Sequence, residues 1–395
     1  MKPLTLMVPG PVQVSASVLN RMASTQIPHY GEQAIGAYSA CVEKLRPLFG
    51  LRHGGNIYIF PGSGSVANEV CSATFISPGD EVIVATNGTF GERVRDQAAA
   101  YGARVVEVRS ELGMPVTAAM VESALRAHPA ARLLMAVHLE TSTGVLNSIE
   151  EIGRVAGAHG VPFAVDSVSS FATERIDMEG CNISICATAT QKGLETPPGV
   201  GIVAVSEAGW RTLLERKTTG TGWFLNLLLW KKVQEGKEIR KGVVYPLPVT
   251  MPVNNVLALL ESLEDIEREG WENRLARHHG IAVAVRQGMK DMGFALFPQE
   301  GFCSNAVTAV RNSHSIDVAE MIAFLKGFAH TEISNGLFEL YNKLVRIGHI
   351  GQTAERECVV PVLFGIECYL REKGKNVTLG SSLAGIEKTL RGGVT

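Results

Sequence analysis

The sequence predicts an α/β protein with two domains: a large domain with a mostly parallel sheet between helices, and a smaller C-terminal α+β domain. Length is the first observation, because 395 residues exceed one ordinary domain and suit a large domain with a smaller companion. The second is a repeated alternation of short apolar runs with segments of helical spacing, which is typical of parallel strands covered on both faces. The third is a change of this rhythm after the run GVGIVAVS, which indicates a second domain.

The alternation starts near residue 31 and runs to Asp166. Apolar runs predict strands, and the segments with helical periodicity between them predict helices. Strands are expected at 56–60, 81–86, 104–109, 132–139 and 162–166, and helices at 32–50, 65–76, 93–102, 117–128 and 149–160. Ligands bind at the carboxyl ends of the strands in open α/β sheets, so the loops after these strands should meet at one crevice.

Two more apolar strands, at 182–190 and 199–206, end this part of the chain. The proline-rich segment 245–255 should be extended, because proline disfavours helices and central strands. Long helices follow it, then strands at 305–311 and 343–348 and two last helices. We therefore expect an N-terminal arm over 1–15, a large domain over 16–253 and a small domain over 254–395.

Composition excludes several classes of function. A formal net charge of −2 gives no reason to expect nucleic acid or an anionic membrane as a partner. The seven cysteines are dispersed, with no CxxC pair and no metal-ligand spacing, so neither a disulfide framework nor a metal site is expected. No segment resembles a signal peptide, and no apolar run approaches the roughly 18 residues of a membrane helix. We expect a cytoplasmic protein.

The loop after the first expected strand, PGSGS at 61–65, is a candidate phosphate cradle. Its glycines allow close approach of the backbone, Ser63 can cap the helix that follows, and free N–H groups at a helix start attract anions. The alternative is an ordinary glycine-rich turn with a serine cap. The loop is neither a dinucleotide fingerprint nor a Walker loop, which disfavours a dehydrogenase or a nucleotide-binding protein.

Asp166 and Lys192 are two charged residues that directly follow apolar strands. Asp166 at the end of VPFAVD would pair with a protonated ring nitrogen, or else cap a turn; a metal is disfavoured because no second ligand is near it in sequence. Lys192 would form a Schiff base with an aldehyde cofactor, or else lie in solvent. Together with the cradle at 61–65, they match the needs of pyridoxal phosphate for a phosphate site, a carboxylate at the ring nitrogen and an amine.

Six motifs extend this interpretation to a family: SGS at 63, NGTFGERV at 87, ETSTGVLN at 140, VDSVSS at 165, QKGLETPPGVG at 191 and LVRIGHIG at 344. From near residue 10 to near residue 350, the sequence resembles the class-V aminotransferases of the fold-type I pyridoxal-phosphate enzymes. It most resembles the alanine–glyoxylate and serine–pyruvate aminotransferases, with pyridoxamine–pyruvate and 2-aminoethylphosphonate transaminases as more distant relatives. The resemblance implies the fold-type I architecture and pyridoxal 5′-phosphate as the cofactor.

The resemblance also implies a role for each matching position. Lys192 carries the cofactor and moves the proton, Asp166 binds the pyridine nitrogen, and Arg346 binds the substrate carboxylate, with bidentate geometry that suits arginine. The turn at Gly10 closes over the substrate. The remaining cofactor contacts are the ring stack of Phe90, the ring-oxygen neighbour Ser142, and the phosphate ligands Ser63, Gly64, Ser65 and Gln191.

A further implication is a homodimer with shared active sites. Relatives supply a threonine and a tyrosine to the phosphate of the neighbouring subunit. Thr250 matches the threonine, but the tyrosine position falls on Leu247, and Tyr245 is two residues away. The segment at His29 and Tyr30 varies with substrate in the family.

We therefore expect a ping-pong aminotransferase that moves an amino group from a small amino acid, alanine or serine, to glyoxylate or pyruvate. One alternative is a transaminase for another amine, such as 2-aminoethylphosphonate or pyridoxamine, with pyruvate. Another is a lyase or cysteine desulfurase, for which Cys303 and Cys358 are the candidate thiols; Gln191 argues against it, because desulfurases place a histidine there. An inactive binding protein on the same scaffold is disfavoured, because lysine, aspartate and arginine are all present.

Overall fold

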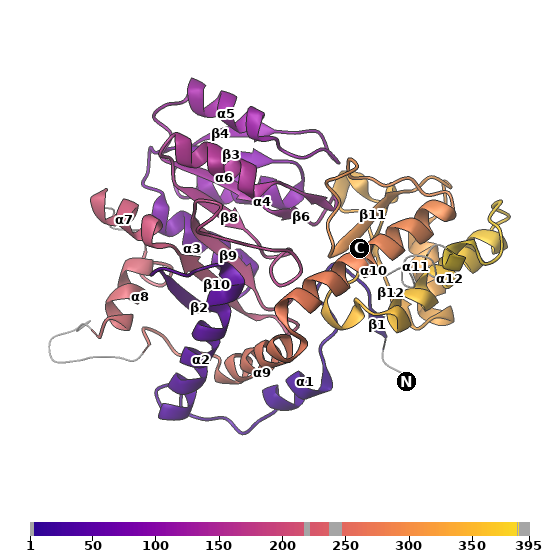
Figure 1. Cartoon of the computed structure of the whole chain (residues 1–395), viewed down its shortest axis with the longest axis horizontal. Helices are drawn as coiled ribbons and strands as arrows, with labels where there is room; N and C mark the ends of the chain where they lie inside the picture. Colours follow the sequence, from indigo (N-terminus) through magenta and orange to yellow (C-terminus); the bar gives the residue numbers. More distant parts are fainter. Residues whose placement is uncertain (1–3, 217–221, 237–246, 385, 387–395) are drawn as a thin grey trace.

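The computed structural model describes residues 4–216, 222–236, 247–384 and 386. Figure 1 shows a larger body, indigo to pink, beside a smaller lobe in orange and yellow. The larger body contains the main sheet with its helices, and the smaller lobe contains the C-terminal helices and strands. The N-terminal strand β1 (Thr5–Leu6) lies with the smaller lobe, because it pairs with β12 (Thr331–Glu332).

The large domain is built on a seven-stranded sheet in the order β2-β10-β9-β8-β5-β3-β4. Every pairing is parallel except those of β10, which is antiparallel to both of its neighbours. The predicted mostly parallel sheet is therefore confirmed. Its strands are β2 (Asn56–Gly62), β3 (Glu81–Thr86), β4 (Arg104–Arg109), β5 (Leu133–Val137), β8 (Phe163–Asp166), β9 (Ile183–Ala189) and β10 (Gly199–Val205).

Helices cover the sheet because its central strands are apolar along their whole length and cannot face water. All residues of β5, β8 and β9 are buried. Helix α3 packs on β9 and β10, α4 packs on β3 and β5, and α9 packs along α1 and α2. The helices are α1 (Ala16–Met22), α2 (Glu32–Phe49), α3 (Gly64–Phe75), α4 (Thr89–Ala100), α5 (Ala118–Ala127), α6 (Ile149–Ala158), α7 (Glu207–Glu215), α8 (Leu227–Gln234) and α9 (Val253–Glu269).

The strand predicted at 132–139 is divided in two. Strand β5 ends at Val137, where the backbone N–H of His138 donates to the Asp166 carbonyl. The chain then enters a short hairpin of β6 (Leu139–Glu140) and β7 (Val145–Leu146). Because of this break, the segment 140–145 projects from the carboxyl end of the sheet instead of extending it.

The small domain has a three-stranded antiparallel sheet in the order β11-β14-β13, with helices packed against it. Its core also includes Met7 of the N-terminal arm, which is fully buried. The predicted α+β domain is confirmed. Its elements are α10 (Trp271–Asp291), β11 (Val307–Arg311), α11 (Val318–Phe328), β13 (Ser334–Asn335), β14 (Leu344–Gly348) and α12 (Arg356–Glu372), with 3-10 turns at Phe338–Leu340 and Gly351–Thr353.

The domain boundary expected at residue 253 stays a prediction, but the packing favours a later position. Apolar residues of α9 from Val253 to Ile266 belong to the same hydrophobic core as the large sheet. Helix α10 instead supplies Ile281 and Val285 to the core of the small domain. We propose that the boundary lies at Gly270, between these two helices. In the described part of the chain, no helix combines the length and apolarity needed to cross a membrane.

Candidate active site

One cavity of about 230 Å³ lies at the carboxyl ends of the parallel strands. Its walls come from the loops after β2, β3, β5, β8 and β9, as expected for an open α/β sheet. Most of the residues predicted to bind the cofactor line it together: Ser63, Gly64, Ser65, Phe90, Asp166, Gln191 and Lys192. Sequence positions more than a hundred residues apart therefore meet at one site.

The start of α3 is an open anion cradle. Ser63 is the N-cap residue, yet its hydroxyl makes no capping hydrogen bond. The first N–H groups of a helix have no acceptor within the helix and carry partial positive charge. A Cβ on Gly64 would lie 2.8 Å from the Val168 side chain, so only glycine allows this turn to approach the loop after Asp166. These features fit a phosphate group.

Asp166 ends β8 and is buried, with both carboxylate oxygens oriented by donors. Asn68 Nδ2 donates to Oδ2 at 2.7 Å, and the Val168 backbone N–H donates to Oδ1 at 2.8 Å. Burial raises the pKa of this carboxyl, while the two hydrogen bonds and the charges of Lys192 and Arg93 act in the opposite direction. A carboxylate held in this way suits a protonated ring nitrogen.

Lys192 lies in the loop between β9 and β10 with its amine inside the cavity. Burial, and then the charge of Arg346, lower the pKa of this amine to about 8, against the opposing charge of Asp166. The amine donates a hydrogen bond to the Pro9 carbonyl of the N-terminal arm. A lysine with a lowered pKa supplies the neutral amine that attack on an aldehyde requires.

A buried arginine holds the lysine loop in place. Arg274 of α10 donates to the Ala172 carbonyl at 2.8 Å and to the Gly193 carbonyl at 2.6 Å. Its charge is balanced by Glu195 at 3.2 Å and by Glu269 at 3.0 Å. The hydrogen bond to Gly193 joins the first helix of the small domain to the residue that follows Lys192.

Arg346 lies on β14 and is buried near the amine end of the cavity. Its Nε donates to the Asn335 carbonyl at 2.9 Å and its Nη1 to the Thr141 carbonyl at 3.0 Å. Burial lowers the pKa of this guanidinium to about 10, and Glu140 opposes that change. No carboxylate of the described residues forms an ion pair with it within 4.0 Å, so it is available to a substrate carboxylate.

The N-terminal arm connects Arg346 with Lys192. The Gly348 N–H donates to the Met7 carbonyl at 2.8 Å, and the Val12 N–H donates to the Gln191 carbonyl at 3.3 Å. Gly10 has a φ of +130°, and a Cβ there would lie 2.6 Å from Lys192 Cδ. Only glycine therefore allows the arm to cross over the lysine.

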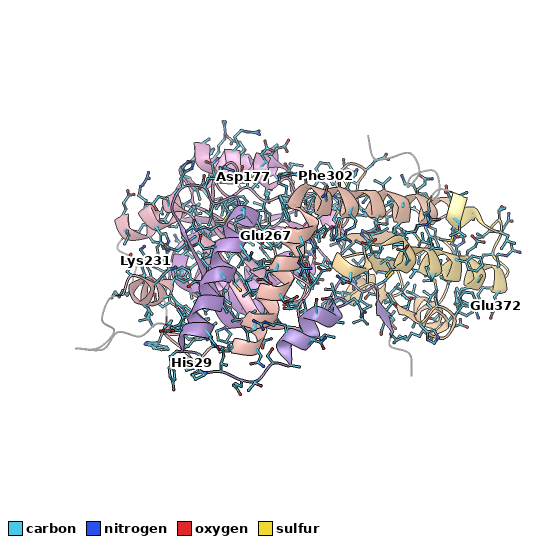
Figure 2. All side chains as sticks on the ribbon, turned by 60° about the horizontal axis from the view of Figure 1, so that its bottom comes forward. His29, Asp177, Lys231, Glu267, Phe302 and Glu372 are labelled. Carbon is cyan, nitrogen blue, oxygen red and sulfur yellow. The ribbon has the colours of Figure 1, made fainter. Side chains whose placement is uncertain are left out.

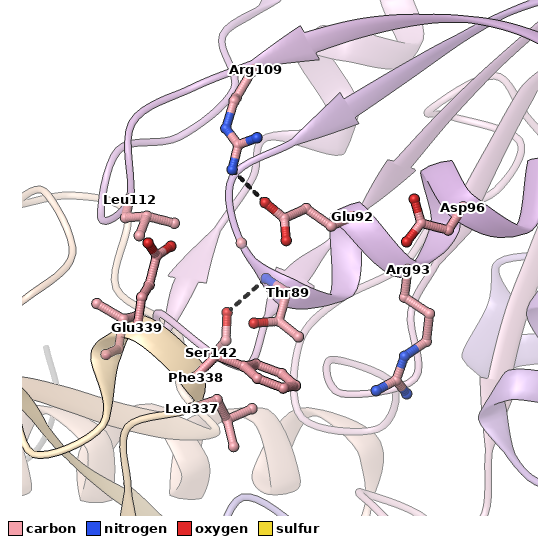
Figure 3. A pocket seen from close by; sticks show the side chains of 12 residues that line it. Thr89, Glu92, Arg93, Asp96, Arg109, Leu112, Ser142, Leu337, Phe338 and Glu339 are labelled. Atoms are coloured by element: carbon pink, nitrogen blue, oxygen red, sulfur yellow. Dashed lines mark hydrogen bonds and ion pairs between the residues drawn. The ribbon is translucent and has the colours of Figure 1, made fainter. Parts of the chain in front are cut away.

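Ser142, expected beside the ring oxygen, is bound to other groups in the structure. Its hydroxyl donates to Glu140 Oε1 at 2.5 Å and accepts from the Thr89 N–H at 3.1 Å. It lines the adjacent cavity of about 590 Å³, which Figure 3 shows together with Phe338 and Arg93. Its contact with the cofactor stays a prediction.

Two further positions named from the sequence lie outside the cavity, and a third is not described. Thr250 is exposed and does not contribute to the cavity of its own chain. Tyr30 is 66% exposed, and its ring packs edge-on against His29, which Figure 2 shows at the periphery of the large domain. Tyr245 lies outside the described residues.

The sequence analysis missed several side chains that organise the site. Glu140 is fully buried and accepts hydrogen bonds from the backbone N–H groups of Phe90 and Gly91, both at 3.0 Å. Asn68 orients Asp166, and Thr141 lines the cavity. Asn68 could have been found from helical spacing, because it lies one turn after Gly64 on the face that begins the cradle. For Glu140 and Thr141, position within ETSTGVLN was the available signal.

The cavity and its sheet define a class of protein, the fold-type I pyridoxal-phosphate enzymes. The chain belongs to the class-V aminotransferase family, since the family model described as "Aminotransferase class-V" matches residues 13–327. It is 32% identical to an uncharacterised aminotransferase of Methanocaldococcus jannaschii over 94% of both chains. It is 28% identical to the serine–glyoxylate aminotransferase of Methylorubrum extorquens, over 98% of this chain and 96% of that one.

The solved structures agree. The structure of pyridoxamine–pyruvate aminotransferase from Mesorhizobium loti matches with a TM-score of 0.91 and 26% identity, covering 99% of this chain and 98% of that one. The protein is therefore a pyridoxal-phosphate-dependent aminotransferase, as the sequence predicted. The open cradle and the buried lysine and aspartate fit this cofactor.

Replacing Gly10 with alanine should block the site. The new methyl would collide with Lys192, so the lysine must leave its position, and covalent cofactor attachment should fall by about tenfold or more. Borohydride reduction followed by peptide mapping measures this attachment. Gly36→Ala on α2 is the matched control, because a Cβ there meets nothing within 4 Å. Equal labelling of Lys192 in both variants would contradict the proposed crossing of arm and lysine.

Attachment of the cofactor to the apoenzyme should depend on pH through Lys192. The neutral amine is the nucleophile, so the rate should rise with pH and level off above about 8, where the amine has lost its proton. A free alkylamine, measured in parallel, corrects for the ionisation of the cofactor itself. A rate that keeps rising to pH 10 would show that Lys192 has the ordinary pKa of a lysine.

Proposed function

We propose that the protein transfers an amino group from a small amino acid, such as alanine or serine, to glyoxylate or pyruvate by a ping-pong mechanism. The observation that carries this proposal is Arg346, a buried guanidinium with free donors at the amine end of the cavity. A guanidinium can bind one carboxylate with two parallel hydrogen bonds, which places the α-carbon of the substrate near the lysine amine.

Each side chain of the site would have a separate role. Lys192 Nζ would attach the cofactor and then remove and return the α-proton of the substrate. Asp166 would hold the ring nitrogen protonated, and the bound cofactor supplies a ring that stabilises negative charge at the substrate carbon. Phe90 would stack on the ring, Ser142 would lie on its oxygen side, and the phosphate would bind at the Ser63–Ser65 turn and Gln191.

The comparisons support small 2-oxo acids more strongly than any one amino donor. Two of the relatives described above are named for glyoxylate and for pyruvate, both of which carry a single carboxylate. Their named donors differ, serine in one and pyridoxamine in the other. A transaminase for another amine therefore stays the second candidate.

The desulfurase alternative has less support. It needs an ionised thiol that can reach the substrate. Burial raises the pKa of both candidate thiols, Cys303 and Cys358, which reduces their nucleophilic form. The dispersed cysteines, all of them free, support our proposal that the protein works in the cytoplasm.

A half-reaction screen tests the proposed function. The cofactor-loaded enzyme is mixed with a panel of amines, and loss of the absorbance of the lysine-bound cofactor is followed in single turnover. We expect alanine or serine to react fastest, and glyoxylate or pyruvate to restore the absorbance. Faster reaction with 2-aminoethylphosphonate, taurine or pyridoxamine would overturn the donor but leave the family intact.

Arg346→Ala should raise the KM for the 2-oxo acid by about a hundredfold or more, because a charged pair of hydrogen bonds to the carboxylate is lost. The affinity for the cofactor should change little. Arg346→Lys should recover only part of the loss, since one ammonium cannot form both bonds. An unchanged KM in Arg346→Ala would place the carboxylate elsewhere.

We also propose a homodimer in which Thr250 binds the cofactor phosphate of the neighbouring subunit. Its exposed position, outside the cavity of its own chain, leaves it free to do so. Light scattering should give the mass of a dimer, and Thr250→Ala should weaken cofactor binding by a few fold. Thr378→Ala, an exposed change in the small domain, is the control. A fully active monomer would rule out the shared site.

A further inference from the structure

We propose that Arg93 is a further cofactor-binding residue, whose guanidinium neutralises the phosphate of pyridoxal phosphate. The residue lies on α4, three positions after Phe90. It lines the same cavity as Ser63, Ser65 and Lys192. This inference rests on the cofactor of the proposed function and is independent of which amino acid is the donor.

The charge of the phosphate requires a cation in the site. A phosphate monoester carries between one and two negative charges near neutral pH. The cradle residues Ser63, Gly64, Ser65 and Gln191 offer it only neutral donors. Among the described residues that line the cavity, Lys192 and Arg93 are the cations, and Lys192 is committed to the covalent bond. Arg93 is therefore the cation that remains for the phosphate.

The face of α4 that carries Arg93 is directed toward the start of α3. Gln97 lies one turn after Arg93 on α4, and its Nε2 donates to the Ser65 carbonyl at 3.3 Å. Residues four apart lie on the same face of a helix, so Arg93 faces the start of α3 as well. The guanidinium carbon lies 5.0 Å from the centre of the Phe90 ring, along the wall expected to carry the cofactor.

Among the described residues, Arg93 has no acidic partner within 4.0 Å, unlike Arg95 two positions later. Arg95 pairs with Asp96 at 2.8 Å and with Glu107 at 3.3 Å. No carboxylate of the described residues forms such a pair with Arg93 within 4.0 Å. Figure 3 shows its side chain extending from α4 with no interaction drawn to it, while Arg109 is bonded to Glu92.

Arg346, which is buried close to Lys192, and Arg93, which lines the cavity, act on different groups of the site. Arg346 lowers the pKa of Lys192, whereas Arg93 lowers that of Asp166, against the larger effect of burial. The substrate reacts at the lysine end, and the ring nitrogen lies at the Asp166 end. Arg93 is thus on the side of the cofactor, which favours the phosphate over a second group on the substrate.

Equilibrium binding to the apoenzyme tests the proposal. Dissociation constants are measured for pyridoxal 5′-phosphate and for pyridoxal, which lacks the phosphate, in wild type, Arg93→Gln, Arg93→Lys and Arg95→Gln. We expect Arg93→Gln to raise the dissociation constant of pyridoxal phosphate by about tenfold or more and to leave that of pyridoxal unchanged. For Arg93→Lys, the dissociation constant of pyridoxal phosphate should lie between those of wild type and Arg93→Gln. For Arg95→Gln, it should equal that of wild type. Inorganic phosphate should raise the Tm of apo wild type and Arg95→Gln but not of Arg93→Gln.

Three outcomes would overturn the proposal. Equal affinity for pyridoxal phosphate in Arg93→Gln and Arg95→Gln would remove Arg93 from the phosphate site. If Arg93→Gln weakened the binding of pyridoxal and of pyridoxal phosphate equally, Arg93 would act through the Phe90 ring. An unchanged cofactor affinity with a raised KM for a dicarboxylate would assign Arg93 to the substrate. A wild type that binds the cofactor at Lys192 but does not transaminate would contradict the proposed function and leave this test valid.

Discussion

The buried amine of Lys192 is the constraint on which the rest of the site depends. A lysine is seldom buried unless its charge is paired or lost, because dehydrating an ammonium is costly. Here the backbone keeps the amine inside. Arg274 donates a hydrogen bond to the Gly193 carbonyl. A Cβ on Gly193 would collide with the Phe171 carbonyl, so the loop packs closely against that segment. Burial lowers the pKa of the amine, so a larger share of it is neutral and able to act as a nucleophile.

Charged groups of both signs lie at the site of that amine, and each comes from a different element. Asp166 ends β8, Arg346 lies on β14, and Glu140 lies in the β6–β7 hairpin. Glu140 is fully buried and accepts four hydrogen bonds from Phe90, Gly91 and Ser142 while partly offsetting Arg346. One carboxylate therefore positions the start of α4, which carries Phe90, and partly offsets the charge of Arg346. In a medium of low polarity, these couplings are stronger than the same contacts would be in water.

The fold and the reactive residues could be predicted because they are set by local pattern. Apolar runs show where strands end, and Asp166 and Lys192 follow such ends directly, so their shared location follows from sheet geometry. The partners of these residues depend on contacts between distant segments. Asn68 and Arg274 meet Asp166 and Gly193 only after α3 and α10 have packed. No periodicity signals such contacts.

The differences in the fold have a similar origin. The break between β5 and β6 arises where the N–H of His138 donates to the carbonyl of Asp166, a bond between two strands that periodicity in one strand cannot reveal. Helix α9 follows the proline-rich segment and is therefore expected from the sequence to begin the small domain, yet its apolar face packs into the core of the large domain. A change in local pattern marks the end of the alternation, while the domain boundary depends on where a face is buried.

The same charge balance bears on the substrate. In the proposed site, the ring nitrogen would balance Asp166, and Arg93 and the start of α3 would balance the cofactor phosphate. Arg346 would then be the cation left near the lysine amine for the substrate. Its charge is already partly offset by Glu140, which leaves room for one carboxylate. A second anionic group there would be buried without a counter-charge, at a cost of several kcal/mol. The arrangement of these charges therefore favours a monocarboxylate acceptor such as glyoxylate or pyruvate, on grounds independent of the names of the relatives.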